Sequence, residues 1–180
     1  MTRNGIPRTI CCTLLVVLTL VNAPAEAQSS RSRRDRRTDT ASSRGTSDAA
    51  AGDWNQFRGP NRDNICTETG LLDSWPPTGP QLVQTINGLG EGYSSVALVG
   101  DLIYTMGNVA DGEYVMALSR STGEIVWKFR NGDAYRENMG NGPRATPTVV
   151  DGLVYSLGAN GDLSCLKADS GELIWKGNVL

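Results

Sequence analysis

The chain of 180 residues contains no histidine, and only 6% of its residues are aromatic. Without histidine, Ser-His-Asp and Cys-His arrangements for nucleophilic catalysis are impossible within this chain. Metal chemistry also lacks support, because no Asp-x-Asp-x-Asp-Gly loop is present and the two cysteines beyond residue 27, Cys66 and Cys165, are far apart in the sequence. The sequence therefore assigns no catalytic and no metal-ligating residue.

Positive charge is also scarce where the chain is able to fold. From residue 52 onward, nine Arg and Lys stand against fifteen Asp and Glu, a net charge of −6. Phosphate backbones require concentrated positive charge, so nucleic acid is excluded as a partner. After residue 27, no apolar run is long enough to span a bilayer and no 3.6-residue apolar period is sustained. We expect few helices and no transmembrane segment in the mature chain.

Residues 1–27 have the layout of a secretory signal peptide. Arg3 and Arg8 precede an apolar run at Cys11–Val21, and Ala25-Glu26-Ala27 follows as a small-residue cleavage signal. The apolar run is too short to cross a bilayer as a helix. We therefore predict cleavage near Ala27 and a periplasmic or secreted product.

Residues 28–51 form a different kind of segment, with six Arg, three Asp and no large apolar side chain. Such a composition cannot bury enough apolar surface to offset the entropy of ordering. We interpret it as a disordered linker, which leaves 52–180 as the folded domain.

One nine-residue sequence pattern occurs twice in that domain. It reads STGEIVWKF at Ser121–Phe129 and DSGELIWKG at Asp169–Gly177, a spacing of 48 residues. Upstream, Ser94–Gly107 aligns with Ala145–Gly158 at a spacing of 51, so the copies differ by a three-residue indel within one turn. Loops absorb such length changes, and the pattern therefore indicates a tandem structural repeat.

Each copy is predicted to contain four short strands separated by Gly-, Asn- and Asp-containing turns, residues that tolerate the positive φ of tight hairpins. The predicted strands are Val96–Val99, Leu102–Met106, Tyr114–Leu118 and Ile125–Phe129, then Thr148–Val150, Leu153–Leu157, Leu163–Leu166 and Leu173–Lys176. Gln81–Ile86 is predicted as one extra strand.

A four-stranded antiparallel unit of about 50 residues, repeated in tandem, is typical of a β-propeller blade. The predicted fold is therefore all-β, with blade one at about 94–130 and blade two at about 145–177. Trp127 and Trp175 are predicted to lie flat against the adjoining blade, because an indole buries a large area and still donates its N–H. Gly123 and Gly171 are expected to make the turns of this docking motif.

The pattern A-x-x-x-x-T-G-x-x-x-W, with Ala117, Thr122-Gly123 and Trp127, resembles the tryptophan-docking repeat of quinoprotein alcohol dehydrogenases and their PQQ-like β-propeller relatives. The second copy has Cys165 in place of Ala and Ser170 in place of Thr. The segment DWNQFRGPNRDN at Asp53–Asn64 is similar to the start of exported bacterial PQQ-like repeat proteins. Propellers of this family usually have six to eight blades, so the resemblance implies that this sequence is the N-terminal part of a longer protein.

Two cysteines remain after cleavage of the signal peptide, Cys66 and Cys165. Export permits a disulfide between them. However, Cys165 takes the place of Ala117 in the repeat, which favours a small buried thiol.

The loop Asn131–Pro147 is the main candidate for a site, because loops between blades carry function in propellers. Arg144 and Glu91 are expected near the central channel, and the resemblance gives Arg144 the role of pairing with a carboxylate of pyrroloquinoline quinone (PQQ). Alternatively, these charges form solvated salt bridges or hold the loops in place.

Two function classes remain open. In the first, the protein is a non-catalytic exported propeller that binds proteins or extracellular polymers. In the second, it is part of a PQQ-dependent alcohol dehydrogenase of the polyvinyl-alcohol type, in which Ca²⁺ polarises the quinone. We favour the binding propeller, because the residues required for quinone chemistry are not recognisable in these two blades.

Overall fold

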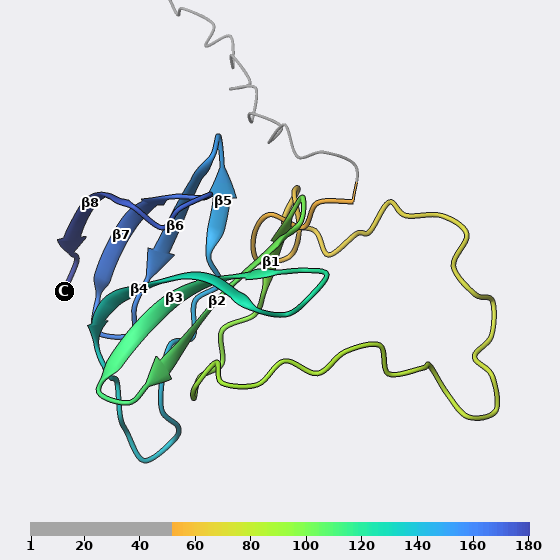
Figure 1. The fold of residues 1–180 in the computed structure, drawn as a ribbon, viewed down its shortest axis with the longest axis horizontal. Coiled ribbons are helices and arrows are strands. Elements are labelled where there is room, and N and C mark those ends of the chain that lie inside the picture. Colours follow the sequence, from red (N-terminus) through yellow and green to blue (C-terminus); the bar gives the residue numbers. More distant parts are fainter. Residues whose placement is uncertain (1–51) are drawn as a thin grey trace, which may run out of the picture. The chain divides into compact units, whose positions relative to one another are not determined.

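The computed structural model describes residues 52–180, so the predicted signal peptide (1–27) and linker (28–51) lie outside the described residues. The described chain forms two antiparallel sheets of four strands each (Figure 1). The first sheet contains β1 (Ala97–Val99), β2 (Leu102–Val109), β3 (Gly112–Ser119) and β4 (Ile125–Asp133). The second contains β5 (Thr148–Val150), β6 (Leu153–Leu157), β7 (Asp162–Lys167) and β8 (Leu173–Asn178). In each sheet the strands follow chain order, which confirms the predicted all-β architecture of two propeller-type blades.

Several strands of the first sheet are longer than their sequence pattern predicts. Val109 pairs with Gly112 across a two-residue loop, so β2 and β3 continue to the end of that hairpin. Gly112 also pairs with Asp133, which carries β4 three residues into the segment that the sequence predicts as loop. Backbone pairing extends a strand beyond its apolar residues, because each added residue gains ladder hydrogen bonds.

The hydrophobic core lies between the two sheets. On β2 and β3 its members alternate along the strand, because successive side chains point to opposite faces of a sheet. Met116 and Leu118, on the other face of β3, are buried as well. The buried members are Ala97, Tyr104, Met106, Val115, Ala117 and Trp127 from the first sheet and Val149, Val154 and Leu166 from the second. The repeat therefore builds one core from two sheets, and neither sheet buries this face alone.

The segment that precedes the first sheet is hydrogen-bonded to the first strand of each sheet, through Trp54 and Asn55. Trp54 exchanges both backbone hydrogen bonds with Leu98 of β1, with N···O distances of 2.8 and 2.9 Å. Asn55 accepts a hydrogen bond from the Val149 amide of β5 (2.8 Å) and returns one from its side chain to the Val149 carbonyl (2.9 Å). Both sheets thus hold the start of the described chain in place.

The prediction of an extra strand at Gln81–Ile86 is wrong. This segment belongs to a long excursion between Asn64 and Glu91 that leaves the sheets (Figure 1) and contains no strand. A strand needs a partner for its ladder, and no residue from 52 to 180 supplies one to Gln81–Ile86. Only Ile86 of the six is half-buried, and it lies against Gly123.

Cys66 is exposed, Cys165 is buried, and both are free thiols. The buried-thiol interpretation of Cys165 is therefore confirmed, and the alternative disulfide is not formed. Within residues 52–180, no helix is long and apolar enough to cross a membrane.

Candidate functional site

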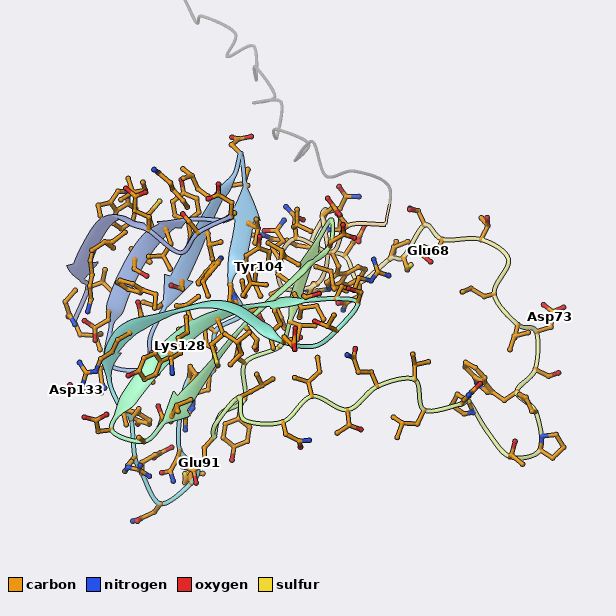
Figure 2. The ribbon with its side chains drawn as sticks, viewed as in Figure 1. Glu68, Asp73, Glu91, Tyr104, Lys128 and Asp133 are labelled. Atoms are coloured by element: carbon orange, nitrogen blue, oxygen red, sulfur yellow. The ribbon has the colours of Figure 1, made fainter. Side chains whose placement is uncertain are left out.

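One contact between the two sheets consists of an aromatic pair and a single carbonyl group. The indole of Trp127 lies against Gly171, where an added Cβ atom would come within 2.6 Å of the ring. The indole Nε1 donates to the backbone carbonyl of Ala168 at 3.0 Å, and the hydroxyl of Tyr104 donates to the same carbonyl at 3.2 Å. Figure 2 labels Tyr104 at this junction. Burial raises the pKa of Tyr104 to about 12, so its hydroxyl remains a donor throughout the physiological pH range.

The second sheet presents the same aromatic pair without a neighbour among the described residues. The ring centroids of Tyr155 and Trp175 are 6.1 Å apart with an interplanar angle of 52°, against 6.0 Å and 54° for Tyr104 and Trp127. Yet Trp175 is 44% exposed, whereas Trp127 is 9% exposed. The repeat therefore reproduces the geometry of the pair, and the adjoining sheet decides whether it is buried.

The two residues that precede each indole show no such difference between the sheets. Ile125 in the first sheet and Leu173 in the second are both 43% exposed, and Val126 and Ile174 are similarly exposed at 53% and 47%. Gly123, the repeat partner of Gly171, contacts Gln84 and Ile86 instead of an indole.

A polar network joins the sheets at the loop end of the same seam. Glu113 of β3 is 1% exposed and accepts a hydrogen bond from the Ala159 amide at 3.1 Å. Asn131 donates to the Asp162 carbonyl at 2.9 Å and accepts from the Ser164 hydroxyl at 2.8 Å. Burial raises the pKa of the Glu113 carboxyl, and hydrogen bonds from Ala159 and Asn131 oppose the rise in pKa. The sequence alone gave no sign of this buried carboxyl.

Arg144, the predicted ligand-binding arginine, is held by its own loop. Its guanidinium donates to Glu137 at 2.7 Å and to two backbone carbonyls of the same loop at 2.7 and 3.0 Å. It also lies over the rings of Tyr135 and Tyr93, at 4.8 and 5.6 Å from their centroids. These contacts fix the position of Arg144 and use three of its donor directions.

Glu91, the second predicted site residue, lies in the same cluster of loops (Figure 2). Its carboxylate accepts from Asn141 at 3.0 Å and from Arg136 at 3.5 Å, and its backbone bridges to Asn108. Glu91 and Arg144 make no hydrogen bond or ion pair with each other in the described chain. The structure thus brings the two residues into one loop cluster without joining their charges.

These residues do not fit a quinone with Ca²⁺. The carboxylate of Glu91 is already engaged, and within residues 52–180 no three Asp, Glu, His or Cys side chains are grouped as a metal site requires.

A cavity of about 480 Å³ lies beside β5, where the fixed N-terminal segment meets the end of the loop 131–147. Arg58, Arg62 and Arg144 line it together with Phe57 and two threonines. Sequence reasoning identified Arg144 but missed Arg58 and Arg62. The available signal was the Arg-Gly-Pro-Asn-Arg run, which has turn residues between two arginines.

A protein-family model described as outer membrane protein assembly factor BamB matches residues 111–179, a range that includes β3 to β8. BamB of Moranella endobia (strain PCIT) is 36% identical over 73 residues, which cover 39% of this chain and 19% of that protein. BamB of Yersinia pestis is 35% identical over 72 residues, which cover 38% and 18%. The match thus spans about one fifth of the length of these relatives.

Similar solved structures include a europium-containing methanol dehydrogenase, 19% identical over 50% of this chain and 16% of that chain, with a TM-score of 0.39. BamB of Moraxella catarrhalis is 21% identical over 52% of this chain and 23% of that chain, with a TM-score of 0.31. The family match includes most of the two sheets and the whole second copy of the repeat. Over residues 111–179, the chain therefore contains a PQQ-like β-propeller repeat region of the BamB type.

Proposed function

We propose that this chain is part of an exported, non-catalytic β-propeller that binds a protein or an extracellular polymer. The match of residues 111–179 to proteins named as outer membrane protein assembly factors carries this proposal. The signal-peptide pattern of residues 1–27 supports a periplasmic or secreted location, with cleavage near Ala27.

The aromatic pairs supply the framework for such a propeller. Trp127 and Gly171 form the docking contact between the two blades, and Tyr155 and Trp175 offer the same pair to a further blade. An apolar aromatic surface of this kind is expected to be covered in the assembled protein. The complementary surface would present a turn glycine and a carbonyl three residues before it, as Gly171 and Ala168 do here.

The loop 131–147 is the proposed contact surface for a protein partner. Met139, near the middle of this loop, is 86% exposed, so its apolar side chain is accessible to a partner. Ser121 serves as a control position far from this loop. It lies in the turn between β3 and β4, and β4 runs from that turn to the loop, so the turn and the loop are at opposite ends of the sheet.

A site-specific photo-crosslinker in the intact natural protein tests this proposal in cells. A crosslinker at Met139 is expected to give a defined adduct, and the same group at Ser121 is expected to give none. In parallel, the purified protein is supplied with PQQ and Ca²⁺ and assayed for dye-linked alcohol oxidation. Turnover in that assay would replace the binding proposal with the dehydrogenase alternative.

A further inference from the structure

The cavity beside β5 is lined by an unusual number of arginines. Of the eight described residues that line it, three are arginine and none is acidic. Residues 52–180 carry only nine Arg and Lys against fifteen Asp and Glu. One third of the cations of an acidic domain therefore line one cavity, which gives that place a local field opposite in sign to the net charge.

The arginines are placed by a turn that is tightly bonded. Gly59 donates to the Gln56 carbonyl, Arg62 to the Gly59 carbonyl and Asn64 to the Arg58 carbonyl, each at 3.0 Å. The Gln56 side chain accepts from Arg62 Nε at 2.9 Å. This turn is preorganised, so binding would not have to order it.

The backbone of this turn is unusual at both arginines. The φ angles of Arg58 and Arg62 are 66° and 58°, in the left-handed region that glycine and asparagine occupy with less strain. Strained residues of this kind persist where the surrounding structure holds them, and they cluster at ligand sites. Two arginines at positions better suited to glycine indicate that their side chains are required there.

The guanidinium groups retain donors for a ligand. Within residues 52–180, the Arg58 guanidinium makes no hydrogen bond or ion pair, and Arg62 uses only Nε. Arg144 is ion-paired with Glu137 and bonded to two carbonyls of its own loop, which leaves its Nε and one Nη1 hydrogen for a ligand. Guanidinium forks bind carboxylates through paired N–H groups, and such charge-assisted bonds are stronger than neutral ones.

The other residues that line the cavity indicate which groups the ligand carries besides its negative charge. The Phe57 ring is 62% exposed and offers an apolar face, and Thr146 and Thr148 add hydroxyl groups. A cavity of about 480 Å³ accommodates a small organic molecule or a short stretch of a polymer. We propose that this cavity binds a ligand with two or more carboxylates, either a free polycarboxylate or the uronic-acid units of an acidic glycan. This inference rests on the proposed binding function and names the chemistry that the binding site recognises.

Calorimetric titration of the intact natural protein tests the assignment with four probes. Citrate represents a free polycarboxylate, tri-galacturonate an acidic glycan, galactotriose its neutral counterpart, and inorganic phosphate an oxyanion without carbon. We expect one of the two carboxylate probes to bind, galactotriose not to bind, and phosphate to bind more weakly. The tighter carboxylate probe identifies the source of the ligand.

Three variants locate the site. Arg58→Asn and Arg62→Gln are expected to lower the affinity roughly tenfold or more, because each removes a charge-assisted contact. Arg130→Gln removes the same charge from β4, outside the cavity, and is expected to leave the affinity unchanged. Asparagine tolerates the φ of Arg58, so R58N is expected to melt at or above the temperature of the unmodified protein while losing affinity.

Equal affinity of R58N, R62Q and R130Q would overturn the assignment, as would the failure of both carboxylates to bind. Binding of phosphate alone would overturn the ligand class. None of these outcomes depends on the crosslinking or the alcohol-oxidation assay, so the broader proposal stands or fails separately.

Discussion

At the residue scale, Glu113 is the most unusual side chain in the seam. A buried carboxylate is costly unless hydrogen bonds compensate for the loss of water. Here the Ala159 amide and the Asn131 side chain supply them, and burial still raises the pKa of Glu113. Burial between the packed sheets therefore opposes the ionisation of Glu113.

We predict that Glu113→Gln becomes increasingly stable relative to the unmodified protein as the pH rises. Because the folded pKa is raised, Glu113 contributes its full stability below the unfolded pKa of about 4.3 and loses it as the pH rises through the folded pKa. Glutamine is uncharged throughout and keeps an acceptor for the Ala159 amide. Urea-unfolding midpoints at a series of pH values measure the difference.

Ser121→Ala, at the exposed turn before β4, changes no titratable group and is the control for Glu113→Gln, so its effect on the midpoint should be the same at every pH. A difference between E113Q and the unmodified protein that stays constant across this range would contradict the prediction.

At the scale of elements, a glycine turn and an indole join one sheet to the next. Gly171 lies in the turn between β7 and β8 with a φ of 70°, and its missing side chain leaves room for the Trp127 ring. Gly152, in the turn between β5 and β6, has a φ of 72° and no atom within 4 Å of an added Cβ. The two glycines therefore share a backbone conformation and differ in their surroundings.

We predict that Gly171→Ala destabilises the protein more than Gly152→Ala does. Both substitutions incur the left-handed strain of about 1 kcal/mol, and Gly171→Ala adds overpacking against Trp127, about 1–3 kcal/mol. The free energy of unfolding, measured in urea on the intact natural protein, provides the comparison. Equal losses would mean that the Trp127–Gly171 contact does not join the sheets tightly.

At the scale of the whole molecule, the second sheet has one face against the first sheet and an aromatic pair on the other. Trp175 remains 44% exposed because no described residue covers it. Large exposed apolar surfaces favour association in water. The isolated two-sheet unit is therefore expected to be poorly soluble.

We predict that a polypeptide of these 180 residues, produced by itself, associates or unfolds in part. Trp175→Ser is expected to lower the associated fraction, which analytical ultracentrifugation measures. Val126→Ser changes a residue that is already exposed beside a buried indole and should have a smaller effect. A purified monomer that unfolds cooperatively would contradict this prediction.

The sequence alone determined the elements of this protein. Alternation of apolar residues and the positions of turn glycines predicted β5 and β6 to the residue and the other strands to within a few residues. These signals are local, since side chains alternate within a strand and turns need particular φ values. The repeated Trp phrase likewise indicated that two similar sheets would follow each other.

Only the tertiary structure decided which elements have neighbours. Trp127 and Trp175 share one sequence motif, yet the second sheet covers only the first of them. Gln81–Ile86 has a strand pattern and no partner, so it forms no strand. Arg58 and Arg144 are 86 positions apart in the numbering, and they line one cavity because Asn55 is bonded to β5. Burial and charge clustering depend on contacts between segments that are distant in the sequence. A local sequence pattern does not specify these contacts.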